Sequence, residues 1–260
     1  MPVAALDGLE LYYEERGSGR PILLVPGIPA LANDWAPLAE RLSGSRRVIA
    51  FDNRGSGRSS VTPGPYTTAL LAADALALLD HLGIERADVF GVSLGGMIAQ
   101  ELALARPARV DRLVLGCSHC GVSHAARMPR DTGRAFAMES DDWELRMRSL
   151  APLAFARGVD GELLDRFVEK KSGDVQDREG YRAQIAAALS HDTWERLPRI
   201  DRPTLILTGD DDQVIPAASS DVLHERIPDS VLYVVAGAGH LFFLERLDET
   251  VRALETFLAA

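Results

Sequence analysis

Short runs of apolar residues alternate with longer stretches in which apolar positions recur every three or four residues. The short runs are rich in Val, Ile and Leu, which is typical of strands buried on both faces of a parallel sheet that helices cover. They predict strands over Leu9–Glu14, Pro21–Val25, Arg46–Phe51, Ala87–Val92, Val110–Gly116, Thr204–Thr208 and Ser230–Val235. The longer stretches predict helices over Asn33–Leu42, Thr67–Leu82, Leu94–Arg106, Ala217–Arg226 and Leu241–Leu258. This alternation indicates an α/β fold.

The alternation stops between about Gly121 and Arg199. Three charged segments of helical periodicity lie there, Asp141–Leu150, Gly161–Lys171 and Gly180–Ser190, with no convincing strand. A chain of 260 residues is long enough for one large core that carries an insertion. We therefore expect an α/β core over residues 1–120 and 200–260, interrupted by a helical insertion over residues 121–199.

The segment Gly91-Val92-Ser93-Leu94-Gly95 matches the pattern G-x-S-x-G and lies between a predicted strand and a predicted helix. In that context the pattern is typical of a nucleophile elbow, a sharp turn that lifts a serine hydroxyl clear of the sheet. The serine backbone is strained there by about 1–3 kcal/mol, and the flanking glycines prevent clashes. We predict that Ser93 is a nucleophile and that the backbone N–H of Leu94, at the helix start, stabilises an oxyanion.

A serine hydroxyl needs a base, and with this pattern an acid and then a histidine follow the serine along the chain. His240 lies in a glycine-rich loop directly after a predicted strand, where catalytic groups of open α/β sheets gather. His224 falls within a predicted helix and is interpreted as solvated. The acid is expected in the loop after Thr208, which offers Asp210, Asp211 and Asp212; the spacing alone does not decide between them.

A second oxyanion donor is expected from the loop after the strand Pro21–Val25. This loop reads Pro26-Gly27-Ile28-Pro29. The two prolines have no backbone N–H, and Gly27 permits a close approach of the backbone. Ile28 is therefore the candidate by elimination, and such a donor typically stabilises the transition state by ~2.7–4 kcal/mol.

Charge and composition exclude several kinds of protein. The chain has 28 Lys and Arg against 38 Asp and Glu, a formal net charge of −10, which disfavours nucleic acid and anionic lipid as partners. No stretch approaches the roughly 18 consecutive apolar residues of a membrane span. The segment Met1–Glu10 lacks the basic and apolar parts of a signal peptide, so we expect a cytoplasmic protein with no membrane partner.

Two cysteines, Cys117 and Cys120, form a C-x-x-C with His119 and His124 close by. Zinc sites usually draw their donor pairs from separated segments, and redox C-x-x-C motifs sit at a helix start in a short βαβ unit. Because neither context is present, we interpret the cysteines as packing thiols.

Four motifs together resemble the α/β-hydrolase superfamily: Phe51–Ser59, Gly91–Met97, Gly209–Pro216 and Gly239–Glu245. Within it, the chain is most similar to the small capped esterases and lactonases that include 3-oxoadipate enol-lactonases. The resemblance covers nearly the whole chain and is weakest over the insertion. It implies a mostly parallel eight-stranded sheet flanked by helices, with the insertion as a helical cap.

Carried over by position, the resemblance makes Ser93 the nucleophile, Asp212 the acid and His240 the base. It implies a mainly structural role for Asp52 and Arg54. The family often has a histidine where this chain has Pro26, so a side chain that can brace the oxyanion loop is missing there.

These observations lead us to expect a serine hydrolase that acts on a small carboxylic ester or lactone, without a metal or an organic cofactor. C–C bond hydrolysis and cofactor-free perhydrolysis with the same triad stay open, as do a ligand-binding role on this scaffold and a homo-oligomeric state. Arg127, Arg130 and Arg134 are expected to be solvated. Apolar residues of the insertion offer surface to roof a pocket: Met128, Phe136, Met138, Trp143, Met147 and Phe155.

Overall fold

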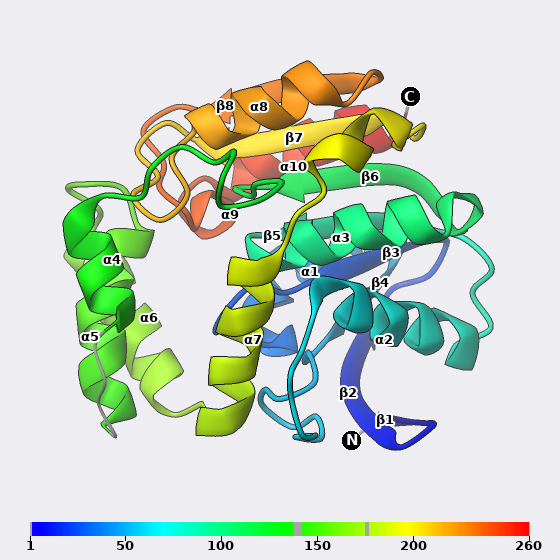
Figure 1. The fold of residues 1–260 in the computed structure, drawn as a ribbon, viewed down its shortest axis with the longest axis horizontal. Helices are drawn as coiled ribbons and strands as arrows, with labels where there is room; N and C mark the ends of the chain where they lie inside the picture. Colours follow the sequence, from blue (N-terminus) through cyan, green and yellow to red (C-terminus); the bar gives the residue numbers. More distant parts are fainter. Residues whose placement is uncertain (1, 138–141, 175–176, 260) are drawn as a thin grey trace.

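An eight-stranded sheet with the strand order β1-β2-β4-β3-β5-β6-β7-β8 forms the centre of the molecule (Figure 1). The computed structural model describes residues 2–137, 142–174 and 177–259. Strands β3 to β8 run parallel to one another, whereas β2 pairs antiparallel with both β1 and β4. The strands are β1 (Val3–Leu6), β2 (Leu9–Arg16), β3 (Arg20–Val25), β4 (Arg46–Phe51), β5 (Ala87–Val92), β6 (Val110–Gly116), β7 (Thr204–Gly209) and β8 (Ser230–Val235). The predicted α/β class and mostly parallel sheet are confirmed.

Helices cover both faces of this sheet. On one face lie α2 (Thr68–His81), α3 (Leu94–Ala105) and α8 (Ala218–Arg226), and on the other lie α1 (Ala36–Leu42), α9 (Phe242–Glu245) and α10 (Leu247–Ala259). Successive strand residues enter opposite cores: Val89 of β5 packs into the core of α2 and α3, and Phe90 into the core of α1 and α10. Both faces are thus buried, which explains the continuous apolar character of the strands.

Further helices lie between β6 and β7 in the chain. These are α4 (Arg130–Ala137), α5 (Trp143–Ala154), α6 (Gly161–Ser172) and α7 (Arg178–Ser190), which we call the inserted helices. Figure 1 shows α4, α5 and α6 beside one end of the sheet, with α7 closer to its centre. Strand β5 ends and helix α3 begins at the same end of the sheet. The inserted helices therefore lie at the carboxyl ends of the parallel strands.

Four details differ from the sequence prediction. Strand β1 and helix α4 were not expected, and the helix predicted from Asn33 begins as a 3₁₀ turn over Ala32–Trp35. The closing helix is divided at Arg246, between α9 and α10. Tertiary contacts decide this break, because the Arg246 guanidinium donates to the Gly237 carbonyl and Glu245 accepts from the amides of Ala156 and Gly239. In the described part of the chain, no helix combines the length and apolar character that crossing a membrane requires.

Candidate active site

The turn between β5 and α3 holds Ser93 in a strained conformation, with φ 56° and ψ −120°. Its neighbours must be glycine because the turn packs against other backbone. A Cβ on Gly91 would lie 2.0 Å from the Gly95 carbonyl oxygen, and one on Gly95 would lie 2.0 Å from the carbonyl oxygen of Val25. The G-x-S-x-G spacing is therefore a steric requirement of this turn.

His240 and Asp212 form a buried hydrogen-bonded pair, although 28 positions separate them in the sequence. The Nδ1 of His240 lies 2.7 Å from Oδ2 of Asp212. The other carboxylate oxygen, Oδ1, accepts hydrogen bonds from the backbone amides of Val214 (2.7 Å) and Ile215 (2.9 Å). These bonds orient the carboxylate, and the carboxylate orients the imidazole so that Nε2 is the nitrogen left for chemistry.

The two preceding aspartates have other partners. Asp210 accepts a hydrogen bond from the Gly237 amide at 2.7 Å, which ties the two loops together. Asp211 pairs with the backbone amide (2.6 Å) and the Nε (2.8 Å) of Arg157 from the insertion. Of the three candidates for the acid, the structure brings only Asp212 to His240. His224 is exposed, and its Nδ1 lies 2.9 Å from the hydroxyl of Ser230, so it does not belong to this pair.

The charge state of His240 depends on its buried surroundings. Burial by itself opposes protonation, but the adjacent Asp212 carboxylate overcomes it, and the pKa of His240 is raised well above 6.5. The other ring nitrogen, Nε2, lies 4.0 Å from the thiol sulfur of Cys117. That thiol donates to the His240 carbonyl at 3.3 Å, and burial raises its pKa, so it is a neutral neighbour.

Ser93 Oγ has no hydrogen-bond partner in the described part of the chain, so it is not bonded to His240 in this structure. The two residues share a neighbour, because the Cys117 thiol contacts both the imidazole of His240 and the backbone of Ser93. The side chain of Ser93 also faces the loop at Gly27, where an added Cβ would lie 3.6 Å from Oγ. The hydroxyl therefore lies near the loop after β3.

The backbone amides of Ile28 and Leu94 are both free to bind an incoming oxygen. Neither has a hydrogen-bond partner among residues that the structure describes. Both residues line the same cavity as Ser93. The Leu94 amide belongs to the first turn of α3, which leaves its N–H unpaired and adds the positive end of the helix dipole.

Two side chains that the sequence analysis did not single out support the loop of Ile28. Asn53 donates from Nδ2 to the Pro26 carbonyl at 3.0 Å, and Lys171 of α6 donates from Nζ to the Pro29 carbonyl at 2.9 Å. They provide the brace that the absent histidine side chain could not. Lys171 is only 1% exposed and also pairs with Asp34 at 2.9 Å and with Asp174. A lysine in a charged helix carries no sequence signal for burial, so only the structure identifies it.

The structural role expected for the motif after β4 agrees with its contacts. Asp52 accepts from the amide of Ala32 at 2.7 Å and from that of Arg58 at 3.0 Å. Arg54 pairs with Asp74 of α2 at 2.5 Å, and its carbonyl accepts from Gln184 of α7 at 2.8 Å. The motif thus connects the loops beneath the site to the inserted helices.

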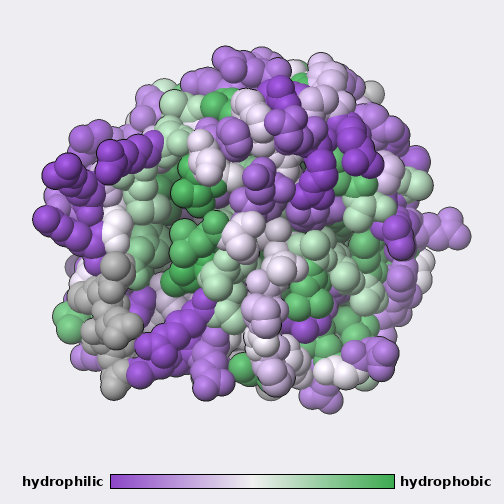
Figure 2. Space-filling model, in the orientation of Figure 1, coloured by the Kyte–Doolittle hydropathy of each residue, from purple (hydrophilic) through white to green (hydrophobic). Residues whose placement is uncertain are grey.

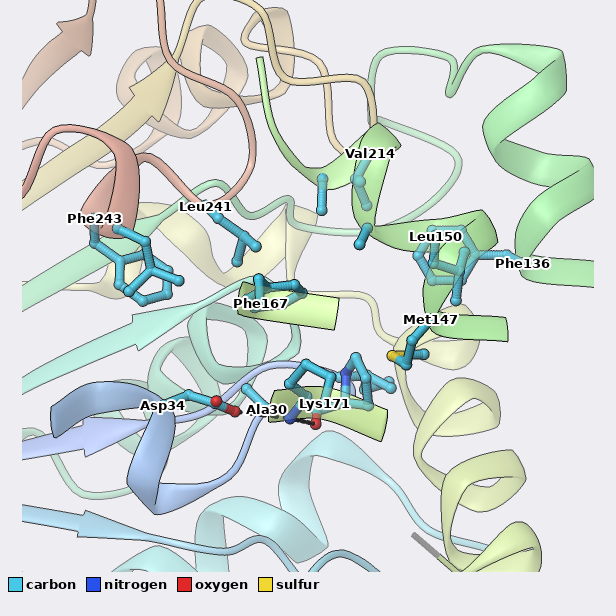
Figure 3. Close-up of a pocket in the computed structure, with 15 residues that line it drawn as sticks. Ala30, Asp34, Phe136, Met147, Leu150, Phe167, Lys171, Val214, Leu241 and Phe243 are labelled. Carbon is cyan, nitrogen blue, oxygen red and sulfur yellow. Dashed lines mark hydrogen bonds and ion pairs between the residues drawn. The ribbon is translucent and has the colours of Figure 1, made fainter. Parts of the chain in front are cut away.

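A cavity of about 370 Å³ opens at Ser93 between the strand ends and the inserted helices. Ile28, Phe136 and Val214 separate it from a smaller cavity of about 70 Å³. Figure 3 shows the smaller cavity, with Phe167 and Leu241 among its walls and Lys171 beside Asp34 at one side. In Figure 2, hydrophobic residues come into view in the hollow between the helices at the left edge and the centre of the molecule.

The expected roof residues divide between these cavities and the core. Met128 and Phe136 line the larger cavity, and Met147 lines the smaller one together with Phe136. Phe155 is fully buried, Trp143 packs edge-on against Tyr181, and Met138 lies outside the described residues. The side chains of Arg127, Arg130 and Arg134 are exposed, as expected, and none of them lines either cavity.

Comparisons with known proteins agree with this architecture. A family model described as the alpha/beta hydrolase fold matches residues 20–247. The chain belongs to the α/β-hydrolase family. The poly(3-hydroxyalkanoate) depolymerase of Ectopseudomonas oleovorans is 32% identical over 241 residues, covering 92% of this chain and 84% of that protein. The 3-oxoadipate enol-lactonase 2 of Acinetobacter baylyi is 32% identical over 219 residues, covering 81% and 78%.

Solved structures show the same relationship. The enol-lactonase from Burkholderia xenovorans superimposes with a TM-score of 0.88 at 28% identity, and the alignment covers 100% of both chains. These findings confirm the resemblance to the esterase and lactonase branch of the α/β-hydrolases. The chain is therefore a hydrolase of this family.

The donors of the C-x-x-C segment do not converge in this α/β-hydrolase. Cys117 and Cys120 are both buried and free, and they pack into the cores on opposite faces of the sheet. His124 stacks on Trp194 with ring centroids 4.2 Å apart. Within the described residues, the one cluster of metal-ligand type is Cys117, Asp212 and His240. One ligand atom from each of these three residues lies within 4.8 Å of the others. Asp212 and His240 are hydrogen-bonded to each other, and Cys117 is the one member that comes from the C-x-x-C segment.

Proposed function

We propose that this hydrolase cleaves a small carboxylic ester or lactone through an acyl-enzyme on Ser93. The hydroxyl attacks the carbonyl carbon while His240 Nε2 accepts its proton. The amides of Leu94 and Ile28 bind the oxyanion, and His240 then passes the proton to the leaving alcohol. Water, activated by the same imidazole, releases the acid and restores Ser93. In a lactone the alcohol and the acid leave as one molecule.

The observation that supports this proposal most strongly is the Asp212–His240 pair at 2.7 Å, beside a strained serine on a cavity wall. The unpaired Oγ of Ser93 turns about a single side-chain bond, and catalytic hydrogen bonds of ligand-free enzymes often form only when substrate binds. The relatives named as a depolymerase of poly(3-hydroxyalkanoate) and as an enol-lactonase favour ester and lactone bonds.

We further propose that residues 121–199 act as a cap over the site. Met128, Phe136 and Ile185 of this segment line the larger cavity opposite Ser93. Lys171 of the same segment holds the loop of Ile28 through the Pro29 carbonyl. The cap therefore both encloses the bound substrate and steadies one oxyanion donor.

The test is hydrolysis of p-nitrophenyl esters of graded chain length, with several lactones followed by pH-stat titration. Ser93→Ala should lower turnover on the order of 10⁶-fold without unfolding the protein. The matched control is Ser18→Ala, at an exposed loop position, which should leave turnover unchanged. Mass spectrometry should detect a fluorophosphonate adduct on Ser93 and none in the Ser93→Ala variant.

The same panel separates the alternative activities. A dienone substrate reports C–C bond hydrolysis, and peracid formation from acetate and peroxide reports perhydrolysis. Undiminished ester hydrolysis by Ser93→Ala would overturn the assignment of the nucleophile. Labelling of Ser93 without multiple turnover of any substrate would instead favour a ligand-binding role.

A further inference from the structure

The wall of the larger cavity is almost entirely apolar. Its described lining residues are aliphatic, aromatic or methionine apart from Gly133, Ser93 and His119. Ser93 is assigned to bond cleavage, so His119 is the one polar side chain left to recognise the remainder of a substrate. No lysine, arginine or carboxylate lies among these lining residues.

Hydrogen bonds determine which nitrogen of His119 carries the proton. The Gly121 backbone amide donates to Nδ1 at 3.1 Å. A backbone N–H only donates, so Nδ1 must present its lone pair, and the proton of the neutral ring is then on Nε2. Within the described part of the chain, Nε2 has no hydrogen-bond partner. Since His119 is half-buried on the cavity wall, its free N–H is available to a bound molecule.

The position and the charge of this donor are both well defined. Gln100 donates to the His119 carbonyl at 3.1 Å and accepts from Thr193 at 2.6 Å, which ties the segment to α3. Burial lowers the pKa of His119 to about 4, and His191, whose ring centroid is 6.3 Å away, is also held neutral. The cavity therefore offers a neutral donor and no cation to offset a carboxylate.

We propose that His119 is a specificity-determining residue whose Nε2–H binds an uncharged oxygen of the substrate, a carbonyl, ether or hydroxyl, in a molecule that is otherwise apolar and carries no carboxylate in this cavity. The inference rests on the proposed ester or lactone hydrolysis and adds the substrate class. A neutral ester or lactone with one additional oxygen matches the wall, whereas a substrate that keeps a free acid group does not.

The experiment replaces single methylene groups by oxygen along a substrate of constant length. Wild-type enzyme is assayed with p-nitrophenyl hexanoate and its 3-oxa, 4-oxa and 5-oxa analogues. The scan is repeated in the alcohol part with hexyl butyrate and its oxa analogues in a pH-stat. Two variants separate the functions of the ring: His119→Asn keeps an acceptor for the Gly121 amide but places no donor at the position of Nε2, and His119→Gln keeps a donor there.

At one oxygen position, the ratio of kcat/KM for the oxa ester to kcat/KM for the parent should be at least about tenfold higher in wild type than in His119→Asn. The preference for the oxa ester should arise mainly from KM and be restored in His119→Gln. It should stay constant from pH 6 to 9. The half-ester 4-nitrophenyl adipate should react at least about 100-fold more slowly than its methyl ester. If His119 had only a structural role, its substitution would lower kcat/KM for all substrates by the same factor.

Ratios equal within twofold at every oxygen position, with Ser93-dependent turnover of the parent esters intact, would overturn the role of His119 and leave the proposed function standing. Equal rates for the half-ester and its methyl ester would overturn the exclusion of carboxylates. Absence of Ser93-dependent turnover of every parent ester would overturn the proposed function and this inference with it.

Discussion

Replacing Ser93 by glycine is expected to make the protein more stable while it abolishes activity. Ser93 has φ 56° and ψ −120°, a backbone conformation that residues with a Cβ adopt only under strain. Such strain costs about 1–3 kcal/mol. Ser93→Ala keeps the Cβ and the strain, whereas Ser93→Gly relieves it, and both variants lack the hydroxyl. The difference between the two variants therefore isolates the backbone.

The magnitude follows from two opposing contributions. At an ordinary position, glycine is less favourable than alanine by about 0.5–1 kcal/mol because it loses more conformational entropy on folding. Subtracting this from the strain leaves Ser93→Gly more stable than Ser93→Ala by about 1 kcal/mol, within a range of about 0–2.5 kcal/mol. For a domain of this size, about 1 kcal/mol corresponds to roughly 2–4 °C in Tm.

Urea unfolding at equilibrium and differential scanning calorimetry measure this difference directly. The matched control is the same pair of substitutions at Ser149, inside α5, where alanine should be more stable than glycine by about 1 kcal/mol. If Ser93→Gly proved less stable than Ser93→Ala, with the sign and size found at Ser149, the turn would not store strain and the reasoning would be wrong.

Three other measurements test the site and its support. His240 must be neutral to act as a base, so kcat/KM should rise with pH through a pKa that Asp212 raises above 6.5. Asp212→Asn should shift this acidic limb of the pH profile to lower pH and reduce kcat about 10⁴-fold. Lys171→Met removes the buried cation that joins the Asp34 and Asp174 carboxylates and should lower the free energy of unfolding by about 3–5 kcal/mol. Lys170→Met, which removes a 41% exposed cation from the other oxygen of Asp34, should cost less than about 1 kcal/mol. His191 has a pKa of about 3, so between pH 3 and 6.5 the unfolded chain binds a proton at this residue that the folded protein does not, and stability falls as the pH falls. His191→Gln should therefore reduce the difference in unfolding free energy between pH 8 and pH 5 by about 2 kcal/mol.

Each of these has an outcome that contradicts it. An acidic limb that does not move in Asp212→Asn would mean that the carboxylate does not set the charge of the imidazole. Equal destabilisation by the two lysine substitutions would mean that burial of Lys171 is unimportant. An unchanged dependence of stability on pH in His191→Gln would place the titrating groups elsewhere.

The turn at Ser93 is the part of the candidate site that could be predicted with most detail. Its signal is local, because the backbone of Gly91 approaches Gly95 only four positions later, and the strand and helix around it have clear periodicities. Ile28 was reached by elimination within four residues. The edge strand β1 was missed because it is short and alternates exposed with buried positions over only Val3–Leu6.

The acid of the pair with His240 could not be chosen from spacing. Asp210, Asp211 and Asp212 are adjacent and chemically identical, and they differ only in which distant group the fold brings to each. Asp211 is taken by Arg157, 54 positions away, and Asp212 by His240, 28 positions away. The family resemblance favoured Asp212, but no property of the three residues themselves does so.

Local sequence was enough to predict the alternation of strands and helices, the sharp turn at Ser93 and the lack of a strand among the described residues of the insertion, because these features depend on residues a few positions apart. The three-dimensional fold was needed to show that Lys171 is buried against the Pro29 carbonyl, that Cys117 and Cys120 occupy opposite cores, and that His119 lines the cavity with Nδ1 accepting from the Gly121 amide. Burial and hydrogen-bond partners depend on contacts between distant segments, and local periodicity carries no information about which segments meet.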